Sequence, residues 1–302
     1  MNDDYRGLTV VVTGGGRGIG RDHVRTLSKL GMNVVVNDLD REAAEDTVAE
    51  VAREGGQAIA LVGDAADPRH ADELVAAAVD GFGGLNGLVI NAGVHRVNWI
   101  EDTPHDEWDA LMHVHLKGTF SLTKSALGYW RKPSTDDATG SPRSIVCTTS
   151  QSGLYGVPAT VAYNVAKGGV ASFVLAAGRE LARHGVRVNG IAPRGLTRMS
   201  DDLVERFQSI GLVPLGMTAE DIVRGRSGRP LRSEDCSALV PWLIGRRSAQ
   251  VTSTVFEISS EEIVIVDGWS RGAASESEQG WTVDSAATAA ESLVLANSGR
   301  TH

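Results

Sequence analysis

The segment TGGGRGIG (13–20) overlaps the end of an apolar run, LTVVVTG (8–14), and opens a stretch with helical spacing. Glycines at such a junction let the backbone turn tightly and approach a pyrophosphate, whose charge is met by amides at the helix N-terminus. Any tight turn also uses glycine, but the strand before it and an acidic residue after it favour dinucleotide binding. The segment therefore predicts a nucleotide-binding loop that contains Gly14, Arg17, Gly18, Ile19 and Gly20.

Further apolar runs, each with the composition of a buried strand, alternate with segments of helical period. The runs are 8–14, 33–38, 58–64, 87–93, 144–150 and 186–193, and the amphipathic segments include 41–56, 70–84 and 104–131. Strands that alternate with helices form right-handed βαβ units around a parallel sheet. We therefore predict an α/β fold: a Rossmann-type, doubly wound parallel sheet with helices on both faces, in a single domain over residues 1–268.

The last third of the chain departs from this alternation. A helix capped by Ser233 is expected first, and TSTVFEIS (252–259) and EEIVIV (261–266) have the composition of closing strands. Beyond them the sequence becomes small and polar, until TVDSAATAAESLVLA (282–296) again shows helical spacing. We expect residues 269–302 to form a C-terminal extension rather than a separate domain.

Composition argues against several classes of protein. The net charge of the 302 residues is −9, and no basic block is interleaved with aromatic residues, which argues against a nucleic-acid groove. Cys147 and Cys236 are far apart, and His113 and His115 point to different sides of a helix, so neither a disulfide framework nor a metal site is predicted. The N-terminus lacks the features of a leader peptide, and the apolar runs fall short of the roughly 18 residues of a membrane span. We expect a cytoplasmic protein with no membrane or nucleic-acid partner.

Asp38, at the end of the second predicted strand, bears on the choice of cofactor. A carboxylate there accepts hydrogen bonds from ribose hydroxyls and repels a 2′-phosphate. Arg17 argues in the opposite direction, because a basic side chain in the loop could bind that phosphate. Since the acid is the better placed of the two, the sequence predicts NAD and disfavours NADP.

The remaining candidate cofactor contacts lie at the C-terminal ends of strands, where ligands bind in an open α/β sheet. Asp64 could accept a hydrogen bond from an adenine amino group, or could simply cap the turn that follows it. The other candidates on this edge are Leu39, Ala65, Asn91, Ala92, Gly93 and Pro193.

The segment SQSGLYGVPATVAYNVAKGG (150–169) brings together a serine, a phenol and an ammonium group: Ser150, Tyr163 and Lys167. The lysine lies four residues after the tyrosine, on the same helix face, where its charge would lower the pKa of the phenol from its usual value of about 10. Tyr163 could then exchange a proton with a reacting alcohol or carbonyl, while Ser150 hydrogen-bonds its oxygen. Lys167 could also hold the ribose. By itself, however, Y-x-x-x-K is also the pattern of an ordinary surface pair on a helix.

In their order and spacing these motifs resemble the short-chain dehydrogenase/reductase family, over residues 8 to about 268. The resemblance rests on TGGGRGIG, Asp38, NAG at 91–93, Ser150 and the Tyr163/Lys167 pair. It implies a Rossmann fold and nicotinamide-dependent interconversion of alcohols and ketones. It also implies homodimers or homotetramers that assemble through the helices beginning near Trp108 and Tyr163.

Two departures from the family pattern define further candidates. His115, in VHLKGTF (114–120), stands where the family usually has an asparagine that helps a proton relay, so it is a candidate for that role or for packing alone. PRGLT replaces the usual P-G-x-x-x-T, and Thr197 is carried over as a cofactor contact. VHLKGTF, SGLYG (152–156) and APRGLTRM (192–199) together resemble the (3R)-hydroxyacyl-CoA dehydrogenase units of peroxisomal multifunctional enzyme type 2, and also actinobacterial hydroxysteroid and steroid-CoA dehydrogenases.

The substrate is expected to contact residues 196–232, where arginines alternate with apolar side chains that could bind an acyl-CoA or a steroid-like molecule; an ordinary solvated loop would look similar. We therefore predict an NAD-dependent 3-hydroxyacyl-CoA or hydroxysteroid dehydrogenase. One alternative is an NADPH-dependent 3-oxoacyl-[acyl-carrier-protein] reductase, which Asp38 disfavours. Another is a non-catalytic dinucleotide-binding regulatory protein, which the presence of Ser150, Tyr163 and Lys167 disfavours.

Overall fold

The computed structural model describes residues 4–132, 141–195, 207 and 231–297. The chain divides into two compact units, Met1–Val266 and Asp267–His302. Each is described by itself.

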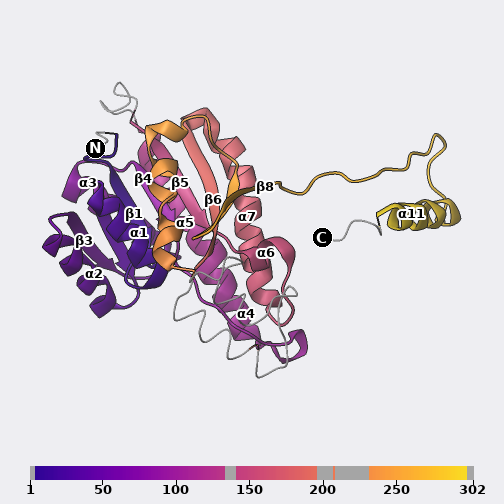
Figure 1. Cartoon of the computed structure of the whole chain (residues 1–302), viewed down its shortest axis with the longest axis horizontal. Helices are drawn as coiled ribbons and strands as arrows, with labels where there is room; N and C mark the ends of the chain where they lie inside the picture. Colours follow the sequence, from indigo (N-terminus) through magenta and orange to yellow (C-terminus); the bar gives the residue numbers. More distant parts are fainter. Residues whose placement is uncertain (1–3, 133–140, 196–206, 208–230, 298–302) are drawn as a thin grey trace. The chain divides into compact units, whose positions relative to one another are not determined.

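The first unit is built on one eight-stranded sheet with the order β3-β2-β1-β4-β5-β6-β7-β8 (Figure 1). The strands are β1 (Thr9–Thr13), β2 (Asn33–Asp38), β3 (Gln57–Val62), β4 (Gly87–Ile90), β5 (Arg143–Thr148), β6 (Val186–Arg194), β7 (Val255–Ser259) and β8 (Ile263–Val266). This confirms the predicted Rossmann-type fold, and a strand overlaps every predicted run.

The last strand runs against the others. Pairs from β1 to β7 are parallel, whereas β8 pairs with β7 in the antiparallel direction. Only residues 260–262 separate these two strands, and a parallel return needs a crossover of about a dozen residues or more. The parallel sheet that the sequence predicts is therefore closed by a hairpin, and Ile263 and Ile265 on its edge strand are exposed.

Helices cover both faces of the sheet (Figure 1). The α-helices of this unit are α1 (Gly18–Lys29), α2 (Arg41–Arg53), α3 (Pro68–Phe82), α4 (His105–Met112), α5 (Gly118–Trp130), α6 (Gln151–Tyr155), α7 (Val161–Leu181) and α10 (Val240–Ile244). A π-helical turn, η2 (His113–Lys117), joins α4 to α5. Short 3₁₀ turns are η1 (Ile100–Asp102), η4 (Ala182–His184), η6 (Ser233–Ser237) and η7 (Arg246–Ser248).

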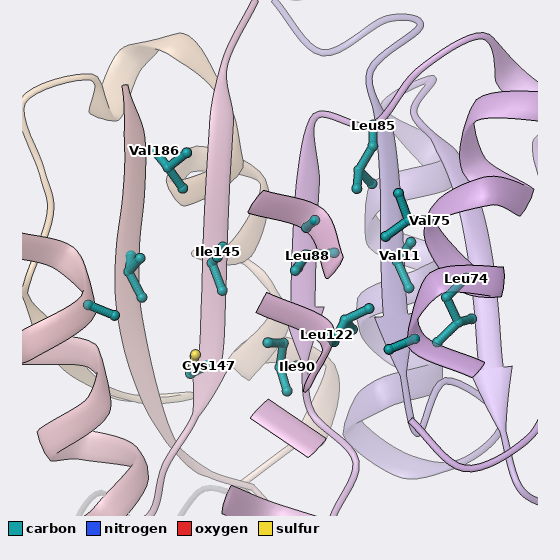
Figure 2. Close-up of a cluster of buried hydrophobic side chains, with 14 of the residues drawn as sticks. Val11, Leu74, Val75, Leu85, Leu88, Ile90, Leu122, Ile145, Cys147 and Val186 are labelled. Atoms are coloured by element: carbon teal, nitrogen blue, oxygen red, sulfur yellow. The ribbon is translucent and has the colours of Figure 1, made fainter. Parts of the chain in front are cut away.

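Alternate residues of each strand enter two separate hydrophobic cores. Val11, Leu88 and Ile145 point to the face covered by α3, α5 and α7, where they meet Leu74 and Leu122 (Figure 2). Their neighbours in sequence, Val10, Val12, Val89 and Val146, enter the opposite core with α1, α2 and α10. Full burial of each such side chain contributes about 1.5–3 kcal/mol. This period of two determines which side chains of a strand face which group of helices.

Helix α7, which packs in the first core, is long and apolar. The segment Val161–His184 is long and apolar enough to cross a membrane by composition alone. Here Ala166, Val170 and Val174 of α7 are buried in the protein core, and this packing accounts for the apolar character of the helix.

One predicted cap is wrong. Ser233 does not cap a helix: it begins the 3₁₀ turn η6, whose N-cap is Arg232. The Ser233 hydroxyl instead donates to a carboxylate oxygen of Asp22 at 2.6 Å, which ties η6 to α1.

Between residues 267 and 297, the described part of the second unit, there is one helix, α11 (Val283–Asn297), which agrees with the helical spacing of 282–296. Within this unit, large apolar side chains such as Trp281, Val294 and Leu295 are exposed. That residues 269–302 are an extension and not a domain stays a prediction.

Candidate active site

The phosphate loop connects β1 to α1 and leaves no room for side chains at its glycines. Gly14 has a φ of +63°, which disfavours residues with a Cβ, and a Cβ there would lie 2.9 Å from the Cα of Ala92. A Cβ on Gly20 would collide with the carbonyl oxygen of Gly14. Arg17 is the N-cap of α1 but makes no capping bond, and no acidic residue lies in the first turn. The loop therefore presents uncapped amides and fits a pyrophosphate group.

Asp38 is held at the edge of this loop by two backbone amides. One of its carboxylate oxygens accepts from the amide of Gly16 at 3.0 Å, and the other accepts from the amide of Asp40 at 3.1 Å. Leu39, between the two acids, is largely exposed. Arg17 donates to the carboxylate of Asp40 at 2.7 Å. Asp38 and Arg17, the two residues predicted to decide between NAD and NADP, therefore both lie at the glycine loop.

Asp64 pairs with a histidine to which the sequence assigned no role. Its Oδ2 lies 2.6 Å from Nε2 of His113 in the π-helical turn, and its Oδ1 accepts from the amide of Ala66 at 2.9 Å. Burial alone would raise the pKa of Asp64, but the bonds from His113 and Ala66 outweigh it and hold the pKa below its usual value. The turn-capping interpretation thus agrees with the geometry, and the partly exposed carboxylate also keeps surface for a ligand. The neighbouring Ala65 is buried.

Asn91 joins three central strands just beyond the end of β4. Its backbone amide donates to the hydroxyl of Thr13 at 3.1 Å, and its side-chain oxygen accepts from Thr148 at 3.3 Å. The amide of Ala92 also donates to the hydroxyl of Thr13. These bonds fix the segment 91–93 against the phosphate loop.

The structure brings Ser150, Tyr163 and Lys167 together. Ser150 is the N-cap of α6, and its hydroxyl accepts from the amide of Ser152 at 3.2 Å and is hydrogen-bonded to the hydroxyl of Tyr163. Lys167 lies one turn further along α7, with its Nζ 5.9 Å from the ring centroid of Tyr163. Its ammonium group donates to the carbonyl oxygen of Thr148 at 2.7 Å.

Burial dominates the ionisation of this cluster. It raises the pKa of Tyr163 to about 12, with the hydrogen bond from Ser150 acting in the opposite direction. It also lowers the pKa of Lys167 to about 7. The sequence led us to expect that the lysine would lower the pKa of the phenol. In this structure the loss of water around both groups has the larger effect on their pKa values. Burial disfavours the charged form of each group, which is the deprotonated phenol and the protonated amine.

Two helices that carry the cluster touch through their backbones. A Cβ on Gly153 in α6 would lie 2.5 Å from the amide nitrogen of Gly168 in α7. On the other side of α6, the side chains of Tyr155 and Gln151 both bond to Glu257 of β7. These contacts, which the sequence did not reveal, hold α6 against both α7 and β7.

His115 is buried at the centre of the π-helical turn. Its Nε2 lies 2.8 Å from the carbonyl oxygen of Val94, and its Nδ1 is buried without a hydrogen-bond partner among the residues described. Burial lowers its pKa to about 3, so the ring is neutral at pH 7. The ring also contacts Tyr163 edge-on, with centroids 5.5 Å apart. His115 is thus a neutral neighbour of the phenol, and a role in proton relay stays a prediction.

His95 is a site residue that sequence reasoning missed. Its ring centroid lies 4.1 Å from that of Tyr163, in a tilted arrangement. One signal in the sequence could have identified it. His95 lies two residues after the segment 91–93, which follows a strand at the edge of the sheet where the cofactor is expected.

The expected substrate segment is mostly outside the described residues, and so is Thr197. Pro193 lies near the end of β6, where it pairs with Ile258. Phe207 is buried in a small cluster with Val97, Val157 and Ala159. Among the residues that the structure describes, no group of three or more His, Cys, Asp or Glu could hold a metal ion.

Comparison with known protein families agrees with the fold, the glycine loop and the cluster of Ser150, Tyr163 and Lys167. A sequence model described as short chain dehydrogenase matches residues 8–206. The chain belongs to this family, whose members use NAD or NADP. It is an oxidoreductase of the alcohol/ketone class.

Individual relatives agree with the resemblance predicted from the motifs. Hydroxyacyl-CoA dehydrogenase ChsB1 of Mycobacterium tuberculosis is 36% identical over 269 residues, which cover 87% of this chain and 80% of that protein. Peroxisomal multifunctional enzyme type 2 of Drosophila melanogaster is 32% identical, over 66% of this chain but only 33% of that longer protein. The crystal structure of a short chain dehydrogenase from Mycobacterium avium has a TM-score of 0.80 and 31% identity, and 96% of each chain is covered.

Proposed function

We propose that this protein is an NAD-dependent dehydrogenase that oxidises the secondary alcohol of a 3-hydroxyacyl-CoA thioester to the ketone. The observation that carries the reaction type is the proximity of Ser150, Tyr163 and Lys167. Hydrogen bonds through Thr148 and Asn91 connect this cluster to the glycine loop. The substrate class is supported by the names of the relatives, and the choice of NAD is supported by the orientation of Asp38. We expect a homodimer or homotetramer.

The residues at the strand ends fit a nicotinamide dinucleotide. The uncapped amides at the start of α1 would hold the pyrophosphate, Asp38 would accept from the ribose hydroxyls, and Asp64 would accept from the adenine amino group. When bound, the cofactor supplies the acceptor for the hydride that leaves the alcohol carbon.

Tyr163 is the group that exchanges the proton of the substrate oxygen. Ser150 shares a hydrogen bond with its hydroxyl, so both can contact one reacting oxygen. Because burial keeps the phenol protonated at pH 7, Tyr163 can donate directly to a ketone. Alcohol oxidation instead requires that Tyr163 accept a proton, so we expect the oxidation rate to rise with pH. Lys167 places a titratable charge beside the phenol.

The proposal is tested in two steps with the whole chain. Binding of NADH and NADPH is measured separately by quenching of tryptophan fluorescence. The favoured cofactor is then used with 3-hydroxyacyl-CoA thioesters of increasing chain length and with hydroxysteroids.

Tight NADH binding with thioester turnover is the expected result. Preference for NADPH together with reduction of 3-oxoacyl-[acyl-carrier-protein] would overturn it in favour of the reductase. Turnover of hydroxysteroids alone would replace the substrate but keep the chemistry. Binding without turnover of either class would favour the non-catalytic alternative.

A further inference from the structure

We propose that Asp40 is a second determinant of cofactor choice, which acts by engaging Arg17 and so withholding it from a 2′-phosphate. The inference rests on the proposed dinucleotide function and deepens it. Asp38 has the direct role in that function, whereas Asp40 was assigned none.

The ion pair joins the glycine loop to the start of α2. Arg17 precedes α1, Asp40 is the N-cap of α2, and the guanidinium nitrogen lies 2.7 Å from Oδ2 of Asp40. Asp38 and Glu42 also act on the same guanidinium through their charges. The one cation that this loop contributes is therefore bonded to one carboxylate and lies near two more.

This arrangement disfavours a 2′-phosphate in two separate ways. In the proposed function Asp38 would accept from the ribose hydroxyls, so its charge would repel a phosphate attached there. Arg17 already shares its charge with Asp40, so it would offset that repulsion less than a guanidinium without an acidic partner. Removing the charge of Asp38 alone would leave Arg17 engaged, so we expect the effects of Asp38 and Asp40 to be non-additive.

The two carboxylate oxygens of Asp40 have different partners, which makes a clean substitution available. Oδ1 accepts from the amide of Ala43 at 3.1 Å and caps α2, while Oδ2 accepts from Arg17. Asparagine keeps an oxygen for the cap and is as good an N-cap as aspartate. Asp40→Asn therefore removes the charge without removing the start of the helix.

The experiment compares the wild type with Asp40→Asn, Arg17→Gln and the double variant. NADH and NADPH dissociation constants are measured by calorimetry, together with those of 5′-ADP and 2′,5′-ADP, which report the 2′-phosphate without any turnover. We expect Asp40→Asn to lower the ratio of the NADPH to the NADH dissociation constant, and that of 2′,5′-ADP to 5′-ADP, by about three- to fivefold, the upper range for one exposed ion pair. The double variant is expected to lose this gain, because the guanidinium is gone.

Glu45→Gln is the matched control. It removes one negative charge from the same helix, but Glu45 pairs with Arg41 on an exposed face rather than with the loop. We expect the ratio of its NADPH and NADH dissociation constants to stay within about twofold of the wild-type ratio, because exposed pairs couple weakly.

The outcomes separate this inference from the function on which it rests. If both the wild type and Asp40→Asn bind NADH, and the ratio of the NADPH to the NADH dissociation constant is the same in both, only the role of Asp40 is overturned. An equal gain in the single and double variants would show simple removal of repulsion, and would overturn the role of Arg17. A wild type that binds neither dinucleotide would overturn both proposals.

Discussion

The ammonium nitrogen of Lys167 is bonded to the carbonyl oxygen of Thr148, the last residue of β5, while only 4% of the lysine residue is exposed. A buried amine of this kind is costly to charge, which explains its lowered pKa. The bond also fixes the distance between the lysine and the phenol, since it anchors the end of a long side chain to the sheet.

Folding stability is predicted to rise with pH through the range that Lys167 controls. Its pKa is about 7 in the folded protein and 10.5 ordinarily, so between these values the unfolded chain binds the extra proton and stability increases with pH. Lys167→Met should lack this increase, which reaches a few kcal/mol at most. Urea unfolding at pH 6, 7.5 and 9 measures the difference. Parallel profiles for the two proteins would contradict the lowered pKa.

Removing the hydroxyl of Tyr163 is predicted to abolish most turnover and to spare cofactor binding. Tyr163→Phe keeps the ring contacts with His115 and His95 but loses the proton, so kcat should fall by about 10²–10⁴-fold. Tyr129→Phe, on the core side of α5, is the control and should stay within a few-fold of the wild type. Steady-state kinetics and NADH titration test this. A loss confined to KM would argue against Tyr163 as the acid–base group.

His115 is predicted to stay neutral throughout the physiological range. Because burial lowers its pKa to about 3, its ring ¹⁵N resonances should not change between pH 5 and 8, and should be those of the tautomer protonated at Nε2. The His115→Asn variant assigns these resonances by their disappearance. A midpoint near pH 6 would show that water reaches the ring and that it can titrate during turnover.

Gly20→Ala is predicted to prevent dinucleotide binding, because the new methyl group would collide with the carbonyl oxygen of Gly14. Gly128→Ala is the matched control: its Cβ meets no atom within 4 Å, and it lies within α5. That variant should bind NADH normally and gain about 0.5–1 kcal/mol of stability. Calorimetry and thermal unfolding test both. Normal NADH binding by Gly20→Ala would refute the assignment of the loop.

Much of the fold could be predicted because its signals are local. Each of the first four strands is an apolar run ended by glycine, asparagine or aspartate, and the candidate catalytic cluster lies within the twenty residues 150–169. The π-helical turn was missed because it keeps the apolar spacing of 104–131 while changing which side chains face inward. His113 meets Asp64 across 49 positions, and no local pattern indicates such a contact.

The ionisation of the cluster could not be predicted for a related reason. Four-residue spacing shows that Tyr163 and Lys167 share a helix face, but it does not show how much water remains around them. The amount of water depends on how β5, α6 and the residues that follow β4 pack around the two side chains, which the spacing does not specify. Spacing therefore predicted that the two side chains lie close together, but it did not predict that the pKa of the phenol is raised.

The contact between Gly153 and Gly168 has a mechanical consequence. With no side chain between the two backbones, there is nothing to compress or rotate, so we expect the segment that carries the serine and the segment that carries the lysine to move together. Entry of a larger substrate would then have to be accommodated by other residues around the site. Exchange of residues 150–168 as a single cassette between relatives should transfer the reactive groups without disturbing their spacing, whereas exchange of either helix alone should not.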